Sequence, residues 1–447
     1  MKMRKMLFSL IAVVFILGMI PELFAGEAAS TAAIVRRRIT PIGVPFDLAA
    51  RELQAPAAIK AKLNALRQEI SARKMRFQVG YTAAMDFDLS QITGLQVPAN
   101  IEQLAAAQNA KAAEAMKALP AAAPVPGCSA TAPSFDWRKA NGVTPIKDQG
   151  PCGSCWAFGT MATFEGSWRV FNGQLINGSE QDILDCNLHG WGCGGGWWAF
   201  DQMVPPNRGI AAEASYPYTH VKAACNTSVA RPYKAAYWGY VPRPANLIPT
   251  VATLKQYLCA FGPIAVAVYV SPAFQAYVGG VFDEHAPNNI NHAVTLIGWD
   301  DSKQAWLIKN SWGTGWGSTC EYGTERGYMW IGYDSNKIGY NAAYVRAQQL
   351  AINLSGKWKG NDQGNYFLTQ LGSALWWLGM SPNSGASWTN VFHGTVSGMS
   401  ISGQWTDVPL GTTRNYGTLG IQIVNFNQLQ RTAVTGGFGG STWSRIQ

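Results

Sequence analysis

All eight cysteines of this 447-residue chain lie between residues 128 and 320, and two of them stand three residues apart in QGPCGSCWAF (149–158). Disulfides persist in oxidising compartments, so frequent cysteines constrain both where a chain folds and how it is held together. The C-x-x-C pair permits three chemistries: a redox dithiol, a metal clip, or a nucleophilic thiol beside a structural half-cystine. The rest of the chain has to distinguish them.

The first 25 residues predict export. Lys2, Arg4 and Lys5 precede an apolar run from Leu7 to Ile20, and small residues follow Pro21. The run is shorter than the ~20 residues that a membrane-spanning helix needs, which is typical of a cleaved secretory signal. An uncleaved anchor is the alternative. We expect a secreted protein, extracellular or periplasmic, with a leader over residues 1–25.

Composition divides the remaining residues into three segments. Residues 26–130 are rich in Ala, residues 131–348 are rich in Trp, Gly and Cys, and residues 351–447 have short alternating patterns without cysteine. The stretch 133–346 holds 15 basic and 15 acidic side chains, so the net charge of +9 comes from the residues before and after it. A neutral central segment argues against nucleic acid as a partner.

The N-terminal segment has helix-forming composition but little aromatic core of its own. Residues 57–74 carry apolar positions three or four apart, and a second Ala-rich stretch covers residues 101–119. A strand-like stretch lies at 76–81, and PAAAPVPG (120–127) is typical of a linker. We expect residues 26–130 to be a pro-region that folds against another domain.

Two of the three C-x-x-C chemistries lack their sequence context. A redox pair needs a buried strand before it, whereas TPIKDQGP (144–151) is typical of a loop. A zinc site needs a second ligand pair at suitable spacing, and the sequence offers none. We therefore predict no metal and no cofactor.

A nucleophilic thiol finds its context. The run after Cys155 has a helical pattern, so Cys155 stands at a helix N-terminus, where the dipole favours a thiolate of lowered pKa. His292 precedes the apolar run 293–297, which predicts a buried strand that would hold the imidazole rigidly. Asn310 follows another apolar strand and could accept a hydrogen bond from the second ring nitrogen, fixing its tautomer.

Four sequence blocks in order resemble the papain-like cysteine peptidases: DWRKANGVTPIKDQGPCGSCWAF (136–158), DCNLHGWGCGGG (185–196), NHAVTLIGW (291–299) and KNSWGTGWG (309–317). The signature of that family places His and Asn ~130–150 residues after the cysteine, and His292 lies 137 residues after Cys155. The resemblance implies an α+β fold with a helical half and a β-barrel-like half. It covers about 215 residues of the chain.

The resemblance assigns catalytic roles residue by residue. It implies that Cys155 is the nucleophile, that His292 is the base and then the acid, and that Asn310 orients the imidazole. Gln149 would donate its amide to the oxyanion together with the Cys155 backbone N–H. Trp312 matches the tryptophan that shields the Asn–His contact from water.

The family pattern also implies structural and substrate-binding residues. Disulfides are expected between Cys152 and Cys193 and between Cys186 and Cys225. In the run 194–196, glycines let the backbone pair with an extended substrate. The resemblance implies a subsite with aromatic walls and a floor of small residues, which favours a bulky apolar P2 side chain. The implied substrate-binding residues are Gly195, Gly196, Trp197, Trp198, Ala267, Ala293 and Trp312.

Three features depart from the family pattern. The third disulfide of the family has no matching cysteines, and Cys128, Cys259 and Cys320 form an odd set. The insertion at 318–324 is unlike the usual short turn, and the pro-region lacks a clear match to the helix pattern of the family. The histidines at 189 and 220 stand in loop contexts typical of solvated side chains.

We expect an exported endopeptidase that is synthesised as a zymogen, acts on polypeptides and is inhibited by its own pro-region. The helix at 57–74 would pack on the enzyme and residues 77–95 would fill the cleft. One alternative is a degenerate family member that only binds, which intact catalytic positions disfavour. Another is an exopeptidase, which would need a blocking segment, and no pair of histidines lies between Cys193 and Cys225.

The C-terminal segment predicts a small antiparallel β domain, a barrel or sandwich. GKWKGNDQGNYFLTQLGSALWWLG (356–379) is similar in style to avidin-like or calycin-like barrels. Most of Trp358, Trp376, Trp377 and Trp405 are expected in the core, with sugar stacking as the alternative, so the domain is interpreted as a binding module for carbohydrate or protein. The candidate strands are 353–359, 364–370, 373–380, 389–397, 400–406, 416–424 and 431–437.

Overall fold

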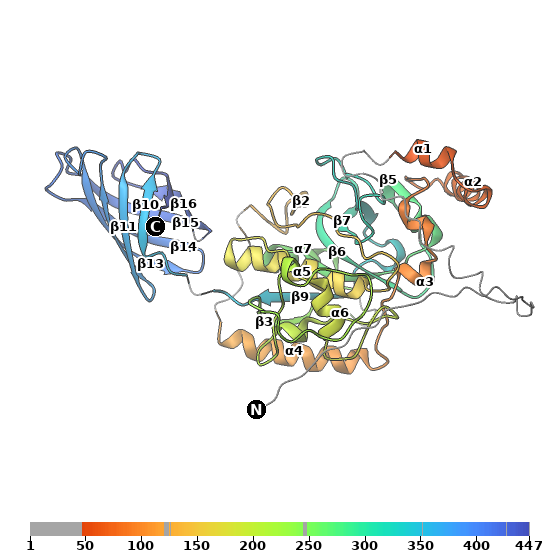
Figure 1. Ribbon diagram of the computed structural model, residues 1–447. Helices are drawn as coiled ribbons and strands as arrows, with labels where there is room; N and C mark the ends of the chain where they lie inside the picture. Colours follow the sequence, from red (N-terminus) through yellow and green to blue (C-terminus); the bar gives the residue numbers. More distant parts are fainter. Residues whose placement is uncertain are drawn as a thin grey trace, which may run out of the picture. The chain divides into compact units, whose positions relative to one another are not determined.

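The computed structural model describes residues 47–119, 125, 127–244, 248–350, 352–425 and 427–446 (Figure 1). The predicted leader lies outside the described residues, as does most of the predicted linker. In these described ranges, none of the helices has the length and apolar character needed to cross a bilayer. The fold is of the predicted α+β class. It has a mixed region of helices and strands over residues 131–348, called the catalytic region after its predicted role, and a closed β-barrel at the C-terminus.

The pro-region is helical in part, as its composition predicts. In α2, the apolar residues at spacings of three and four face the catalytic region, and Leu63 is fully buried. The helix ends at Ala72, shortly before Lys74 adopts a left-handed backbone (φ 52°). The elements are α1 (Leu48–Leu53), α2 (Ala57–Ala72), β1 (Phe77–Val79), η1 (Ala83–Asp86), α3 (Leu89–Ile92) and α4 (Ile101–Lys117).

The helical half of the catalytic region is built around α5 (Cys155–Asn172), which is buried along almost its whole length. Gly173 ends it in the left-handed conformation (φ 70°) that glycine adopts without steric cost. Ser179 caps α6 (Glu180–Cys186) by accepting a hydrogen bond from the Asp182 N–H. Two short 3-10 helices complete this half, η2 (Phe200–Met203) and η3 (Glu213–Ser215).

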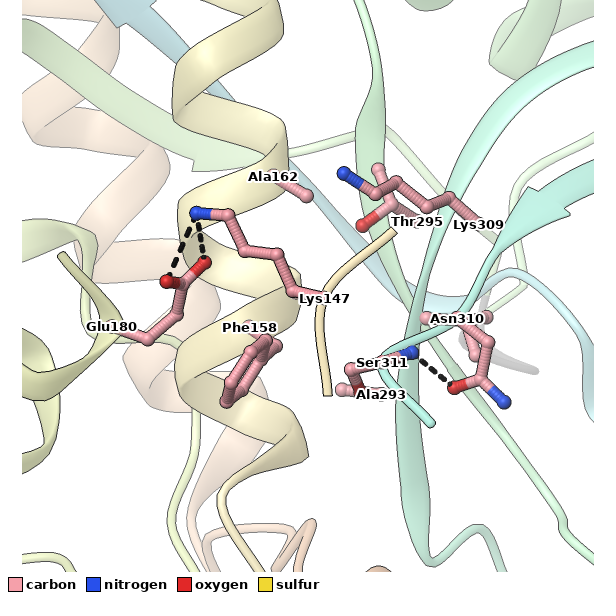
Figure 2. Close-up of a pocket in the computed structure, with 11 residues that line it drawn as sticks. Lys147, Phe158, Ala162, Glu180, Ala293, Thr295, Lys309, Asn310 and Ser311 are labelled. Atoms are coloured by element: carbon pink, nitrogen blue, oxygen red, sulfur yellow. Dashed lines mark hydrogen bonds and ion pairs between the residues drawn. The ribbon is translucent and has the colours of Figure 1, made fainter. Parts of the chain in front are cut away.

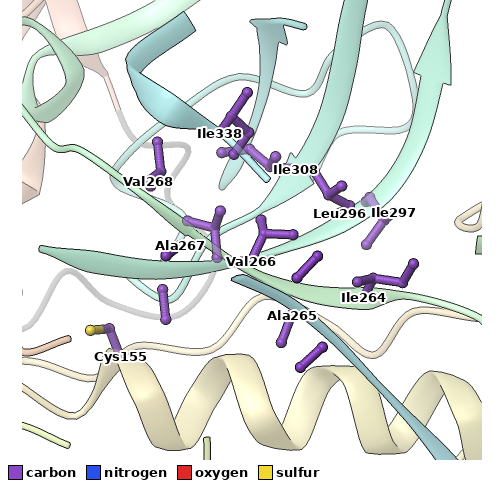
Figure 3. Packing of buried hydrophobic residues seen from close by; sticks show 14 of the residues in the cluster. Cys155, Ile264, Ala265, Val266, Ala267, Val268, Leu296, Ile297, Ile308 and Ile338 are labelled. Atoms are coloured by element: carbon purple, nitrogen blue, oxygen red, sulfur yellow. The ribbon is translucent and has the colours of Figure 1, made fainter. Parts of the chain in front are cut away.

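A sheet of nine strands forms the other half, in the order β1-β5-β8-β7-β6-β4-β9-β3 with β2 paired to β6. Its central strands are buried on both faces, which explains their continuous apolar runs. Figure 3 shows the side chains of β4 and β6 over α5, with Cys155 at the start of that helix. The strands are β1, β2 (Ser134–Asp136), β3 (Ala235–Tyr240), β4 (Ile264–Val268), β5 (Tyr277–Phe282), β6 (His292–Asp300), β7 (Ala305–Lys309), β8 (Tyr328–Gly332) and β9 (Tyr340–Ala347), and the remaining helices are α7 (Val251–Phe261), α8 (Pro272–Gln275) and η4 (Ser335–Lys337).

The C-terminal segment is a closed barrel of eight antiparallel strands, drawn in blue in Figure 1. The prediction of seven strands missed β17, whose Trp443 pairs with Gly360 of β10 and Leu429 of β16 and so closes the barrel. This strand has only four residues, which follow a Gly-rich run and show no clear alternation of apolar and polar side chains. It is therefore recognised only by its pairing in the closed barrel. The strands are β10 (Gly356–Gly360), β11 (Asn365–Leu371), β12 (Ala374–Met380), β13 (Thr389–Ser397), β14 (Ser400–Asp407), β15 (Tyr416–Asn425), β16 (Gln428–Val434) and β17 (Thr442–Arg445).

Three disulfides cross-link the chain. The structure joins Cys152 to Cys193 and Cys186 to Cys225, the pairs that the resemblance implies. A third bridge joins Cys128 to Cys259, two of the three cysteines that the family pattern left unpaired. It connects the segment before the catalytic region to α7. Cys155 and Cys320 are free and buried.

Candidate active site

The predicted thiol and imidazole come from the first residues of two elements. Cys155 begins α5 and His292 begins β6, and both side chains are fully buried. The backbone N–H of Ala293, the residue after His292, lies close enough to the Cys155 sulfur to influence its pKa. The first turn of a helix and the first residue of a strand therefore meet here.

Hydrogen bonds around Asn310 determine the tautomer of His292. The backbone N–H of Ser311 donates to Asn310 Oδ1 at 2.8 Å, which identifies that atom as the amide oxygen. His292 Nε2 lies 2.8 Å from the same oxygen, so Nε2 carries the proton and donates it. Nδ1, which has no hydrogen-bond partner in the described part of the chain, is then the basic nitrogen.

Trp312 covers the imidazole. Its ring centroid lies 4.7 Å from that of His292, and its indole is braced by Phe274 at 5.9 Å and Trp316 at 5.3 Å. With Trp312 only 4% exposed, the His292–Asn310 hydrogen bond is kept from water. A buried hydrogen bond of this kind is electrostatically stronger than an exposed one.

Two N–H donors converge on one carbonyl oxygen of the pro-region. Gln149 Nε2 donates to the oxygen of Ile92 at 3.1 Å, and Trp312 Nε1 donates to the same oxygen at 3.2 Å. Gln149 is held in place because its Oε1 accepts from Ser311 Oγ at 2.6 Å. The prediction had not included Ser311, although its position next to Asn310 in the KNSW block was the available signal.

The pro-region crosses the cleft through main-chain hydrogen bonds. Gly196 N donates to Gly94 O, and Gln96 N donates to Gly196 O, each at 2.9 Å, which makes a parallel bridge between Leu95 and Gly196. A side chain at Gly94 would clash with the carbonyl oxygen of Gly153, and one at Gly195 would meet Gln96. The segment that fills the cleft is thus residues 92–96, the end of the predicted range 77–95.

The start of that predicted range has another role. Phe77 and Val79 lie in β1, which extends the sheet by antiparallel pairing with Gly280 and Tyr277 of β5. The physical reason is that β5 otherwise ends the sheet, and a strand from the pro-region satisfies its free backbone groups.

Of the predicted subsite residues, Gly195, Gly196 and Trp312 contact this segment, and the other four are buried in two settings. Ala267 and Ala293 are cross-strand partners of β4 and β6, both buried. Trp197 and Trp198 are also buried, and each indole N–H is satisfied: Trp197 donates to the Tyr240 hydroxyl at 2.8 Å and Trp198 to the Asn341 carbonyl at 3.0 Å. Both indoles are therefore fixed in place by a hydrogen bond.

Burial sets the charge state of the closed site. It raises the pKa of the Cys155 thiol to about 11, although backbone N–H groups oppose the change, and it lowers the pKa of His292 to about 4. The predicted lowering of the thiol pKa is wrong for this state because the pro-region excludes the water that would stabilise the charged pair. With the cleft filled, both groups are neutral near pH 7.

A buried group of charges lies behind the site, around a cavity of about 20 Å³ (Figure 2). Lys147 Nζ contacts Glu165 at 2.9 Å and Glu180 at 2.8 Å, and Lys309 Nζ donates to the Thr144 carbonyl at 2.8 Å. Desolvation raises the pKa of Glu180 to about 7 and lowers that of Lys309 to about 8. The charges bridge α5, α6 and β7.

Prediction from sequence had missed this charged group. Its signal was a charged side chain inside an apolar pattern, Glu165 within the helix of Cys155 and Lys309 at the end of a buried strand. Such positions are costly unless the charge is paired, so a partner from elsewhere in the chain was to be expected.

The loop histidines are exposed in part, as predicted, and each also has a polar partner. His189 Nε2 lies 2.7 Å from Asp201 Oδ2, which raises the pKa of His189, and the imidazole stacks on Trp191 at 4.2 Å. His220 Nδ1 lies 3.3 Å from the Gln149 carbonyl oxygen. Within the described ranges, no group of three His, Cys, Asp or Glu side chains could hold a metal ion.

The chain is similar to known cysteine proteases. The senescence-specific cysteine protease SAG12 of Arabidopsis thaliana is 40% identical over 49% of this chain and 62% of its own length, and mexicain of Jacaratia mexicana is 38% identical over 44% of this chain and 87% of its own. A solved structure, digestive procathepsin L 3 of Tenebrio molitor larval midgut, aligns with a TM-score of 0.50 and 25% identity over 64% of this chain and 88% of its own.

The chain spans about half to three-fifths of the length of the first curated relatives that it matches. A sequence profile of the papain family of cysteine proteases matches residues 131–347, which contain all four sequence blocks of the candidate site. Because the chain is also 38% identical to mexicain and covers 87% of that protein, it belongs to the papain family of cysteine proteases.

Proposed function

We propose that this protein is a secreted cysteine endopeptidase that hydrolyses peptide bonds through a thioester acyl-enzyme and is made as an autoinhibited zymogen. Two contacts carry the proposal: the buried His292–Asn310 hydrogen bond, and the approach of the pro-region segment 92–94 to both the Gln149 amide and the Cys155 sulfur, which the Ala293 N–H next to His292 also approaches. The papain family to which the chain belongs consists of cysteine proteases.

The chemistry follows from the tautomer and the donors. His292 Nδ1 takes the thiol proton, and Cys155 Sγ attacks the substrate carbonyl carbon while the developing oxyanion accepts hydrogen bonds from Gln149 Nε2 and the Cys155 N–H. His292 then gives the proton to the leaving amine as the C–N bond breaks. Water, deprotonated by His292, cleaves the thioester, releases the acid and restores the thiol.

The pro-region would inhibit by occupying the Gln149 amide, one of the two oxyanion donors, and the backbone of Gly196. The Ile92 carbonyl oxygen accepts from Gln149 and Trp312, and residues 94–96 use the backbone of Gly196. Precursors of this family lay the propeptide in the reverse direction to substrate, which agrees with the parallel bridge at Leu95. Gln149 and Gly196 are then unavailable to a substrate.

Passage of the pro-region through the cleft supports an endopeptidase. The chain runs as a continuous polypeptide from α3, past Gln149, to the backbone of Gly196, which favours a cleft that is open at both ends. An exopeptidase needs one side closed. A non-catalytic binder would not require the buried His292–Asn310 hydrogen bond or a free thiol at Cys155.

The labelling experiment is direct. A thiol-reactive peptidyl epoxide should modify the activated protein once, at Cys155, as peptide mapping by mass spectrometry would show. Modification at Cys320 alone, or none after the pro-region has been removed, would contradict the proposed function. Internal cleavage of a protein substrate would separate an endopeptidase from an exopeptidase.

We also infer that residues 351–447 form a separate binding module that fits carbohydrate. Trp358, Trp377 and Trp405 fill the barrel core, whereas Trp376 is 49% exposed and stacks on His393 with ring centroids 3.8 Å apart. A flat exposed ring pair suits the apolar face of a sugar. Trp376→Ala should abolish retention on insoluble polysaccharide, and retention of that variant, or binding only to proteins, would contradict the inference.

A further inference from the structure

Another helix of the pro-region, α4, packs on the catalytic region after the chain has left the cleft. On one face of α4, Ile101, Ala105 and Ala112 are 8%, 3% and 2% exposed, at the spacing of a single helical stripe. Gln103, on another face, is exposed. These buried residues belong to the same core cluster as the catalytic elements.

Side chains of α4 complete an edge of the sheet. β3 is the last strand in the sheet order, so one row of its backbone groups has no strand partner. Gln108 Nε2 donates to the Trp238 carbonyl at 2.8 Å, and Asn109 Oδ1 accepts from the Tyr240 N–H at 2.7 Å. Figure 1 shows α4 beside β3. Without α4, this edge would lose both hydrogen bonds.

The same strand supports a wall of the cleft. The Tyr240 hydroxyl accepts from Trp197 Nε1 at 2.8 Å, and Trp197 directly follows Gly196, which binds the pro-region. Arg243 lies over the Tyr240 ring at 5.5 Å and pairs with Glu102 of α4 at 3.3 Å. Contacts therefore run from α4 through β3 to the cleft.

The segments before and after α4 differ in how they are held. Residues 97–100 lie outside helices and strands, and Val97, Ala99 and Asn100 are exposed. After α4, Val125 N donates to the Cys259 carbonyl at 2.9 Å, and the Cys128–Cys259 disulfide anchors the chain to α7. Exposed irregular segments are the preferred sites of proteolysis.

We propose that activating cleavage falls within residues 97–100, so that the blocking segment leaves and α4 stays as the N-terminal helix of the active enzyme, where it supports β3 and the wall at Trp197. This proposal rests on the proposed zymogen function. The step is hydrolysis of one peptide bond: water adds, a new carboxylate ends the released part, and a new amine begins the enzyme. A second active molecule or another peptidase performs it.

The first test maps the cleavage. The wild-type precursor is allowed to process itself, and the Cys155→Ser precursor, which cannot, is treated with a trace of active wild-type enzyme or of subtilisin. Intact mass and N-terminal sequencing should find a new N-terminus within residues 98–101, with α4 retained. An active enzyme that begins after residue 119 and has lost α4 would overturn the proposal.

This test separates the two claims. If the processed wild-type chain fails to react with a peptidyl epoxide, the peptidase function fails, while the subtilisin map of the Cys155→Ser precursor still decides where the pro-region is cut. Cleavage confined to residues 120–127 in that map would also overturn the proposal.

The second test examines the support of the cleft. In the processed enzyme, Gln108→Ala combined with Asn109→Ala should raise KM about three- to tenfold for peptides with a bulky apolar P2 residue, with a smaller change in kcat. Gln103→Ala, on the exposed face of α4, is the matched control and should behave as wild type. Equal KM values for the double variant and the control would refute the supporting role of α4.

Discussion

The catalytic region and the C-terminal barrel are stabilised in different ways. The catalytic region joins segments far apart in sequence through three disulfides and a buried group of charges that includes Lys147, Glu165 and Glu180. The barrel has no cysteine, and each of its strands pairs with its neighbours in sequence until β17 returns to β10. Its buried side chains form a cluster of their own. The comparison predicts that substitutions in the catalytic region change peptide turnover and stability, whereas the barrel unfolds independently of them.

The largest expected effect is on chemistry. Cys155→Ser should reduce peptide turnover to background, because a serine hydroxyl is not ionised by this histidine, while unfolding of both regions stays as in wild type. Cys320→Ser is the matched control, since Cys320 is the other free buried cysteine. Turnover by Cys155→Ser, measured with a fluorogenic peptide, would contradict the assignment of the nucleophile.

A large effect on stability is expected at Lys147. Lys147→Met removes the cation between two buried carboxylates and should lower the free energy of unfolding of the catalytic region by about 3–5 kcal/mol. Lys139→Met, at an exposed lysine, is the control and should change little. Calorimetry should find the barrel transition unmoved in both. A barrel transition that shifts together with the catalytic one would break the comparison.

The third expectation is a pH dependence of precursor stability from His292. Its pKa is lowered from 6.5 to about 4 by burial, so the folded precursor binds this proton less tightly than the unfolded chain does. The stabilisation is therefore complete above pH 6.5 and is lost as the pH falls towards 4, by about 3 kcal/mol at most. Chemical denaturation between pH 7 and 4 measures it.

The control for this dependence is His292→Gln. The stability of that precursor should no longer fall between pH 6.5 and 4. Unfolding of the barrel, where His393 is exposed, should not show this fall in either protein. An unchanged slope in the variant would assign the effect to other groups.

The two regions also differed in how far the sequence alone predicted them. In the catalytic region, the helix at Cys155 and the strands before Asn310 and after His292 have strong local patterns, and the family blocks fix the order of the site. The hydrogen bond from Ser311 to Gln149, the Cys128–Cys259 bridge and the position of Ile92 in the cleft depend on segments brought together from distant parts of the chain. Local patterns contain no information about such contacts.

In the barrel, alternation predicted five strands to within one residue of their bounds, since strands such as β11, β12 and β13 bury every second residue. The predicted strands 353–359 and 431–437 were displaced by three residues from the start of β10 and from β16, where alternation is weaker. The eighth strand is four residues long, too short for alternation to be recognised, and it exists because β10 and β16 both need a partner. Closure is a property of the whole barrel.

The smallest expected effect is that of removing the barrel. A chain ending near residue 348 should keep kcat and KM for a short peptide within about twofold, because the Cys155, His292, Asn310 and Gln149 contacts all lie before that point. Residues 352–446 expressed alone should unfold cooperatively, since closed pairing leaves no free edge and the core cluster is complete without other elements. Thermal unfolding and peptide kinetics of the two halves test this directly. Loss of turnover in the shortened chain, with a folded catalytic region, would mean that the barrel contributes to the cleft and that the proposed boundary is wrong.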